Sequence, residues 1–132
     1  MRIEQVPGLD VEQISHLRAI GIHNCKQLLR ASQQWERFPI LSKATNLPAE
    51  VLRRLVRRAE LCGIRGIGPA TLDLLCKLGV DSVAALAEQE PEALRSRFRQ
   101  LTPRPPNLAV IEDWIWQARQ RKGGPSARLS RS

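Results

Sequence analysis

The residues best able to do chemistry form one short stretch, residues 64–69, which reads I-R-G-I-G-P. Gly66 and Gly68 admit backbone conformations that a β-carbon would block. A helix is predicted to begin at Pro69, and the first backbone N–H groups of a helix have no partner inside it. The helix dipole adds partial positive charge at the same place. The stretch therefore predicts a site for an anion, and a phosphate oxygen suits it.

A second basic feature precedes this stretch. The helix predicted from Pro48 to about Leu61 carries four arginines in two pairs spaced by four residues: Arg53 with Arg57, and Arg54 with Arg58. Side chains at that spacing share a helix face, so they form a basic stripe that leads into residues 64–69. The stripe is either a face that follows phosphates or an ordinary solvated helix face. Crowding of like charges is mildly destabilising unless an anion offsets it, which favours the first reading.

Other kinds of site find no comparable pattern. His16 and His23 have no nucleophile or paired carboxylates at useful spacing, so we expect no enzymatic activity and place both at surface or boundary positions. Cys25, Cys62 and Cys76 form no C-x-x-C pair, and each lies in or beside an apolar helical stretch. We therefore expect buried small side chains rather than a disulfide or a zinc site. Neither a metal nor a cofactor is expected.

The charge balance narrows the choice of partner. The chain has 132 residues and a net charge of +8, from 21 Lys and Arg against 13 Asp and Glu. Such a balance favours polyanions: nucleic acid first, then an acidic protein surface, with an anionic membrane surface unlikely. Aromatic residues make up only 4% of the chain, which argues against a reader of unstacked bases. With no apolar run long enough for a membrane span and no signal peptide, we expect a soluble, cytoplasmic protein.

An internal repeat organises the elements that must position these residues. Residues 6–28 align without a gap on residues 64–86, and apolar positions and glycines match together. Each copy predicts a hairpin, a short amphipathic helix that ends before Gly21 or Gly79, and a second short helix capped by Asn24 or Ser82. A longer helix closes each copy, the second beginning after Asn107. No useful stretch alternates with period two, so the fold class is all-α.

The repeat also sets the predicted organisation of the chain. We expect a first repeat over residues 1–61 and a second over residues 62–122, packed together as one compact helical domain. Residues 102–106, with three prolines, form a connector rather than a boundary. Residues 123–132 have no core-forming pattern, and we expect a flexible tail.

The central stretch resembles the helix-hairpin-helix family of DNA repair enzymes, ligases and polymerase accessory domains. The residues that carry the resemblance are Ile64, Gly66, Ile67, Gly68 and Pro69, followed by Leu72 and Leu75. The resemblance implies a hairpin that grips one DNA backbone strand without reading sequence. Over about residues 3–121 the chain is also similar to an uncharacterised bacterial family with tandem repeats of this kind, catalogued as a domain of unknown function.

The first copy departs from the pattern at one position. Asp10 stands where the second copy has Gly68. An aspartate there is a good N-cap for the helix that follows, but its carboxylate would occupy the backbone donors and repel phosphate. We therefore expect the first hairpin to be structural and the second to be the working site.

These observations predict a non-enzymatic binding module for duplex or structured nucleic acid, which contacts phosphates with low sequence specificity. The alternative is a protein–protein interaction adaptor that docks an acidic partner in a larger assembly. The residues predicted to bind nucleic acid are Arg53, Arg54, Arg57, Arg58, Arg65, Gly66, Ile67, Gly68, Ala70 and Thr71.

Overall fold

The computed structural model describes residues 1–33 and 38–121. Within these ranges the chain forms one short 3-10 helix and eight α-helices, with no strand beyond an isolated bridge between Arg2 and Asn24. This confirms the all-α fold class. The predicted tail, residues 123–132, lies outside the described residues. The helices are η1 (Ile3–Gln5), α1 (Val11–Ala19), α2 (Cys25–Ser32), α3 (Phe38–Thr45), α4 (Ala49–Cys62), α5 (Pro69–Lys77), α6 (Val83–Ala87), α7 (Pro91–Leu101) and α8 (Leu108–Arg121).

The helix ends follow from local sequence. Asn24 caps α2 by accepting a hydrogen bond from the Gln27 N–H, and Ser82 caps α6 in the same way from the Ala85 N–H. After α1 and α5 the chain turns at Gly21 (φ +89°) and Gly79 (φ +82°), which have the left-handed conformation that favours glycine. All four predicted positions are confirmed.

The backbone pattern recurs along the chain. Helix α1 and helix α5 have the same length and begin 58 positions apart, as do the N-caps of α2 and α6. Helices α4 and α8 both have 14 residues. Helices α3 and α7, which precede α4 and α8, were not predicted. For α7 a signal was present, because the now-buried Leu94 and Phe98 are spaced by four residues.

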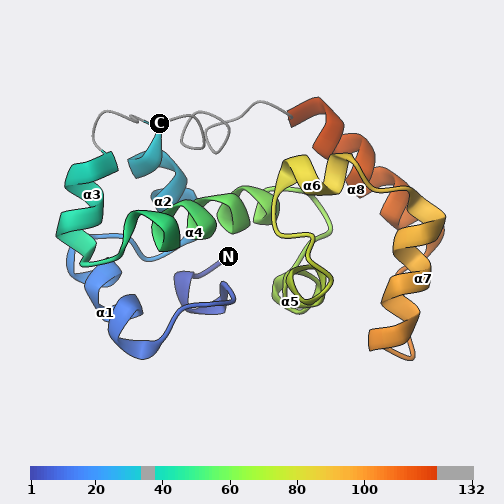
Figure 1. Ribbon diagram of the computed structural model, residues 1–132, viewed down its shortest axis with the longest axis horizontal. Coiled ribbons are helices and arrows are strands. Elements are labelled where there is room, and N and C mark those ends of the chain that lie inside the picture. Colours follow the sequence, from blue (N-terminus) through green and yellow to red (C-terminus); the bar gives the residue numbers. More distant parts are fainter. Residues whose placement is uncertain (34–37, 122–132) are drawn as a thin grey trace.

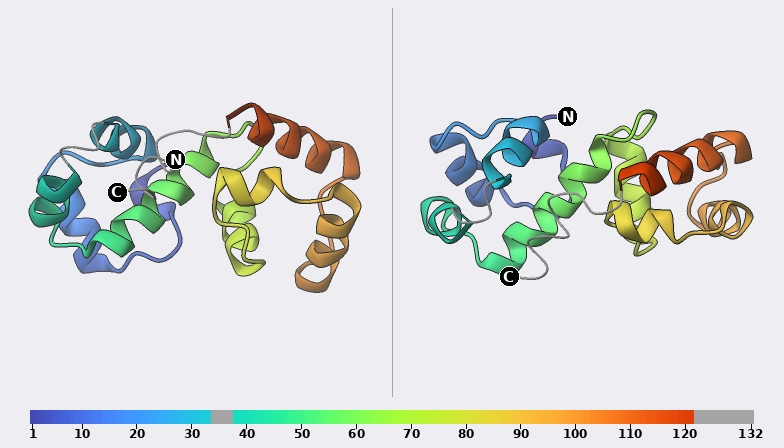
Figure 2. Two further views of the ribbon diagram at one scale, coloured as in Figure 1. Left: turned by 45° about the horizontal axis from the view of Figure 1, so that its top comes forward. Right: turned by 90° about the horizontal axis from the view of Figure 1, so that it is seen from above.

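Two apolar clusters form the core, and α4 crosses the molecule between them (Figure 1). One cluster is built by η1, α1, α2 and α4, and the other by α5 to α8 together with Leu61 and Ile64. The further views in Figure 2 show the same division, with α1, α2 and α3 around one half of α4 and α5 to α8 beyond its other end. Met1 and Cys62 pack against both clusters and so lie where the halves meet.

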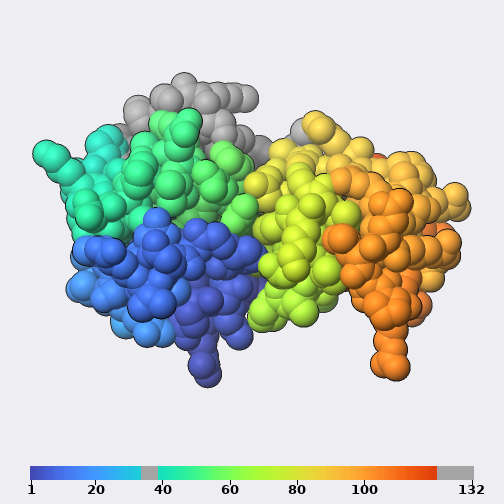
Figure 3. Space-filling model, turned by 60° about the horizontal axis from the view of Figure 1, so that its bottom comes forward, coloured from blue at the N-terminus to red at the C-terminus, as the bar shows by residue number. Residues whose placement is uncertain are grey.

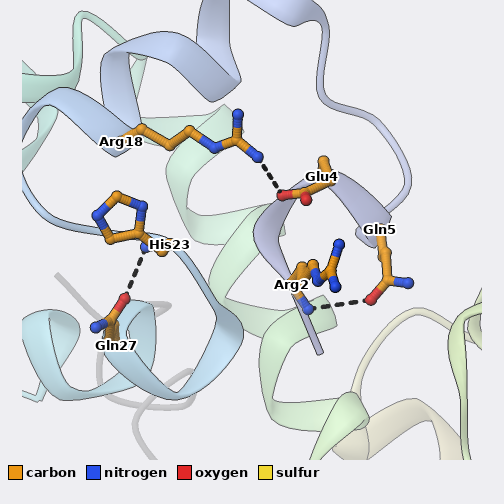
Figure 4. Close-up of polar contacts among 6 residues, drawn as sticks. All are labelled: Arg2, Glu4, Gln5, Arg18, His23 and Gln27. Carbon is orange, nitrogen blue, oxygen red and sulfur yellow. Dashed lines mark hydrogen bonds and ion pairs between the residues drawn. The ribbon is translucent and has the colours of Figure 1, made fainter.

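The N-terminal segment is held against the turn before α2. The Ile3 N–H donates to the His23 carbonyl and the Cys25 N–H donates to the Met1 carbonyl, both at 2.9 Å. Figure 4 shows the polar contacts around this pairing, including the 2.9 Å ion pair between Arg18 and Glu4. The pairing explains how the first residues of the chain reach the junction between the two clusters.

Candidate functional site

The second hairpin follows α4 and packs tightly on α8. Gly66 has φ +95°, and a β-carbon there would lie 2.8 Å from Nε1 of the buried Trp114. Residue 66 must therefore be glycine both for its backbone and for the space it leaves. Gly68, by contrast, does not use glycine's conformational freedom. At φ −95° and ψ −174°, with nothing near its β-position, Gly68 has an extended conformation open to any residue.

A buried glutamine on α8 holds the hairpin backbone. Oε1 of Gln117 accepts from the Arg65 N–H at 2.9 Å, and its Nε2 donates to the Arg65 carbonyl at 3.1 Å. The same Nε2 donates to Oδ2 of Asp113 at 2.8 Å, which fixes the orientation of the amide. Gln117 is only 3% exposed, so α8 builds the hairpin as much as the hairpin's own sequence does. Sequence reasoning missed this residue; the signal was one polar side chain among the apolar positions of α8.

The hairpin residues divide into those that face the core and those that face solvent. Ile67 is 5% exposed, and its N–H donates to the Ile64 carbonyl, so it belongs to the core rather than to a binding surface. Its predicted role as a surface contact is therefore not supported by its position. Pro69 and Ala70 are exposed, and so is the side chain of Arg65, whose guanidinium makes no polar contact with the described part of the chain. The face turned forward in Figure 3 includes α5, coloured yellow-green, as part of the molecular surface.

Helix α5 begins without a side-chain cap. Gly68 is its N-cap residue and offers no acceptor, and Pro69 at the first position has no N–H. Within residues 1–33 and 38–121, no hydrogen bond uses the N–H of Gly66, Gly68, Ala70 or Thr71. Gly68, Ala70 and Thr71 belong to the first turn of α5, at the positive end of the helix dipole. The start of α5 thus has the chemistry that a phosphate oxygen requires.

The first hairpin satisfies itself. Oδ1 of Asp10 accepts from the Gln13 N–H at 2.7 Å, and Oε1 of Gln13 accepts from the Asp10 N–H at 3.1 Å. This reciprocal pair is a capping box. The prediction that Asp10 caps the helix after it is confirmed. The backbone of Asp10 (φ −94°, ψ 174°) matches that of Gly68, so the two hairpins differ in side chain and not in conformation.

The structure does not place the arginines of α4 together beside the second hairpin. Arg58 donates through Nη1 to the carbonyl of Pro7 and lies 3.9 Å from Oδ2 of Asp81, with 14% of its side chain exposed. It therefore supports the first hairpin. The exposed Arg54 lines a small hollow beside the same hairpin. Side chains on a helix lean towards its N-terminus, away from the segment that follows, which is why these arginines turn back from residues 64–69.

The remaining α4 arginines border a shallow open depression. Arg53, Arg54 and Arg57 line it together with Glu50, and its volume is about 410 Å³. Arg57 is half-buried, whereas Arg54 is exposed. The depression is basic but carries one carboxylate, so an anion there would meet both attraction and repulsion. We therefore rank this depression below the start of α5 as a place for an anion.

Several arginines outside α4 serve the fold. Arg97 donates to the Leu78 carbonyl, and Nε of Arg119 donates to the Ala87 carbonyl at 3.1 Å. Nε of Arg95 donates to the Pro106 carbonyl at 3.0 Å and so fixes the proline-rich connector. Part of the basic excess that suggested a polyanionic partner therefore binds backbone carbonyls at the ends of α5 and α6 and in the connector.

The other predicted positions fall as follows. His23 is exposed and His16 is half-buried, as expected for surface or boundary positions. Cys25 is buried, whereas Cys62 and Cys76 are half-buried. Within the part of the chain that the structure describes, no group of three His, Cys, Asp or Glu side chains could hold a metal ion. In the same residues, no helix is long and apolar enough to cross a membrane.

Comparison with known proteins gives one match. Neither a curated protein nor a solved structure matches the chain. Residues 7–121 match a protein family described as a domain of unknown function, DUF4332. The match spans both hairpins and every helix from α1 to α8. The chain therefore belongs to the DUF4332 family.

Proposed function

We propose that this protein is a non-enzymatic module of two tandem helix-hairpin-helix units that binds the phosphate backbone of duplex or structured nucleic acid through its second hairpin. The observation that carries the proposal is the uncapped start of α5, where the N–H groups of Gly68, Ala70 and Thr71 have no partner in the described residues. The exposed guanidinium of Arg65 adds a charged fork beside them. Contacts of this kind position a backbone and do not read bases.

The contrast between the hairpins supports the proposal. Asp10 and Gly68 have the same backbone conformation at equivalent positions, but Asp10 fills its own helix start with a carboxylate, and Gly68 leaves the equivalent place open. Gln117 binds both the N–H and the carbonyl of Arg65, so it fixes the hairpin backbone three residues before Gly68 without using the N–H groups at the start of α5. An exposed cluster of N–H groups with no internal acceptor is satisfied by water or by an anion.

A second candidate function is an adaptor that docks an acidic protein. Trp116 on α8 is 57% exposed, and an exposed tryptophan is a common anchor at protein interfaces. Arg119 and Gln120 follow it on the same helix, so one positive and one neutral polar side chain come next to it in sequence. This surface is distinct from the start of α5, which lets the two functions be tested separately.

The test is fluorescence anisotropy of a labelled duplex titrated with the full chain at several salt concentrations. Phosphate-driven binding gives a log–log slope of about −0.9 for each phosphate neutralised. Arg65→Gln should weaken binding to all sequences similarly and reduce the magnitude of the slope by about 1. The matched control is Arg104→Gln, which removes the same charge from an exposed residue in the connector between α7 and α8.

The outcomes separate the candidates. Retained affinity in Arg104→Gln with loss in Arg65→Gln supports the proposal. Equal losses in the two variants would mean that net charge alone drives binding. If the wild-type chain does not bind duplex at low salt, the nucleic-acid proposal fails. Capture of a partner that is lost in Trp116→Ala would then establish the adaptor.

A further inference from the structure

Three sulfur atoms meet where the two halves of the molecule join. Cys25 is the first residue of α2 and Cys62 is the last residue of α4, and their Sγ atoms lie 3.4 Å apart. Sγ of Cys62 also lies 3.3 Å from Sδ of Met1. The two cysteines are 37 positions apart in sequence, so the contact is made by the fold and not by a local motif.

The approach of the two thiols is fixed by the elements that carry them. Helix α2 packs along α4, and Cys25 at its first turn is also tied to the N-terminal segment through the bond from its N–H to the Met1 carbonyl. Either thiol can donate the hydrogen bond between the two sulfurs, and this contact lowers the pKa of Cys25. The pair therefore includes one thiol prepared to lose its proton.

The two sulfurs differ in access. Cys25 is only 4% exposed, whereas Cys62 is half-buried. The exposed fraction therefore favours access of a small oxidant to Cys62. The contact with Cys25 and burial raise the pKa of the Cys62 thiol, so Cys25 is the sulfur that loses its proton more readily. The third cysteine, Cys76, is half-buried on α5, and burial raises the pKa of its thiol.

We propose that Cys25 and Cys62 are an oxidation site at which a peroxide converts the two thiols into an intramolecular disulfide. Hydrogen peroxide first oxidises one thiol to a sulfenic acid, and the O–O bond breaks with release of one water molecule. The second sulfur then attacks the sulfenic sulfur, which expels a second water molecule. In total the two thiols lose two hydrogens and two electrons, and the peroxide is reduced to two water molecules.

Little motion is needed for this step. The S–S bond of a disulfide is about 2.05 Å long, so the sulfurs must approach by about 1.4 Å. The bond would join the start of α2 to the end of α4, the residue before the turn into the second hairpin. Because it closes a loop of 37 positions, it should raise the melting temperature by on the order of 10 °C.

The experiment treats the full chain with hydrogen peroxide, blocks the remaining thiols and maps peptides without reduction. The proposal expects a mass lower by two hydrogen atoms, a cross-linked peptide pair holding Cys25 and Cys62, and a higher melting temperature that a reductant reverses. Cys76→Ser is the matched control and should keep the cross-link, whereas Cys62→Ser should lose it.

Each other outcome would overturn the proposal. If the wild-type chain gains oxygen at Cys25 or Cys62 without forming a cross-link, the sulfurs do not react with each other. If both thiols stay reduced while Met1 becomes a sulfoxide, the pair is a packing contact only. Because mapping of the wild-type chain decides this alone, a folding defect in Cys62→Ser does not affect the result.

Discussion

The substitution Gly68→Asp places the capping residue of the first hairpin into the second. The new side chain fits without backbone strain or steric clash, since Gly68 and Asp10 share one backbone conformation and nothing lies near the β-position of residue 68. By analogy with Asp10, the new carboxylate should accept a hydrogen bond from the N–H of Thr71. We expect two effects of opposite sign, on folding and on binding.

The effect on folding is a gain. Replacing glycine where another residue fits without strain reduces the conformational entropy of the unfolded chain and stabilises by about 0.4–1 kcal/mol. An aspartate cap adds a few tenths of a kcal/mol over glycine. Together these raise the free energy of unfolding by about 0.5–1.5 kcal/mol, which corresponds to a melting temperature higher by roughly 2–6 °C.

The effect on binding is a loss. A carboxylate about 4 Å from a phosphate is repelled by about 1 kcal/mol in water and by more where solvent is partly excluded. The cap also occupies one N–H donor, worth about 1 kcal/mol. Because the site is exposed we take the lower values, and a total of about 2 kcal/mol predicts roughly 30-fold weaker binding to duplex DNA.

Thermal unfolding and duplex anisotropy on the same samples measure both effects. Gly68→Ala is the control for the backbone: it should leave the affinity unchanged, because it adds no charge and leaves the donors free. Gly68→Asn separates capping from charge, since it caps as a neutral side chain. If Gly68→Asp is more stable yet binds duplex as tightly as the wild type, the start of α5 is not the binding site. If it is less stable, the equivalence with Asp10 is wrong.

Three further predictions concern the support of the hairpin and the buried thiol. Gln117→Ala removes both bonds to the Arg65 backbone and should lower the free energy of unfolding by about 1–3 kcal/mol. The control Gln120→Ala, at an exposed position of the same helix, should change it by less than about 0.5 kcal/mol. Equal unfolding midpoints of the two variants in denaturant would contradict this prediction. Gly66→Ala should destabilise the fold by about 2–4 kcal/mol and Gly79→Ala by only about 1 kcal/mol, because both residues have positive φ but only position 66 lies against Trp114. Similar melting temperatures of the two variants would mean that the Trp114 indole moves aside. Burial raises the pKa of the Cys76 thiol, so at pH 8 a smaller fraction of it is thiolate in the folded chain than in urea. Its alkylation, measured by mass spectrometry, should therefore be slower in the folded chain. Equal rates would show that the thiol is open to solvent.

Much of the fold could be predicted from local sequence. Helix starts at Asn24 and Ser82 and the left-handed turns at Gly21 and Gly79 depend on a few neighbouring atoms, and the structure has all four where predicted. Helix α7 was not predicted, although its buried Leu94 and Phe98 have the four-residue spacing of a helix face. The division of the apolar residues into two clusters depends on long-range packing that no local pattern contains.

The site was predicted less completely, and for a physical reason. The motif I-x-G-I-G-P locates the open start of α5, but not the residue that holds it, because Gln117 lies 52 positions from Arg65. The spacing of the arginines along α4 likewise did not indicate in which direction each side chain points. Arg58 is close to the second hairpin in sequence, yet its contacts are with Pro7, 51 positions earlier, and with Asp81. Contacts between distant segments decide which donors stay free, and spacing along the chain does not reveal them.

The residues that brace the two hairpins have a consequence for how this chain can diverge. Arg58 and Gln117 occupy corresponding turns of α4 and α8, and each binds the residue before a hairpin glycine. Pro7 has a backbone carbonyl but no N–H, so a side chain that only donates, such as that of Arg58, is sufficient. Arg65 has an N–H as well, so a side chain that both donates and accepts, such as the amide of Gln117, is required. If Arg58 alone were replaced by glutamine, the amide oxygen would have no donor at Pro7. If Gln117 alone were replaced by arginine, the N–H of Arg65 would face a guanidinium. Hairpin and brace must therefore be inherited, or transplanted into another protein, as a matched set.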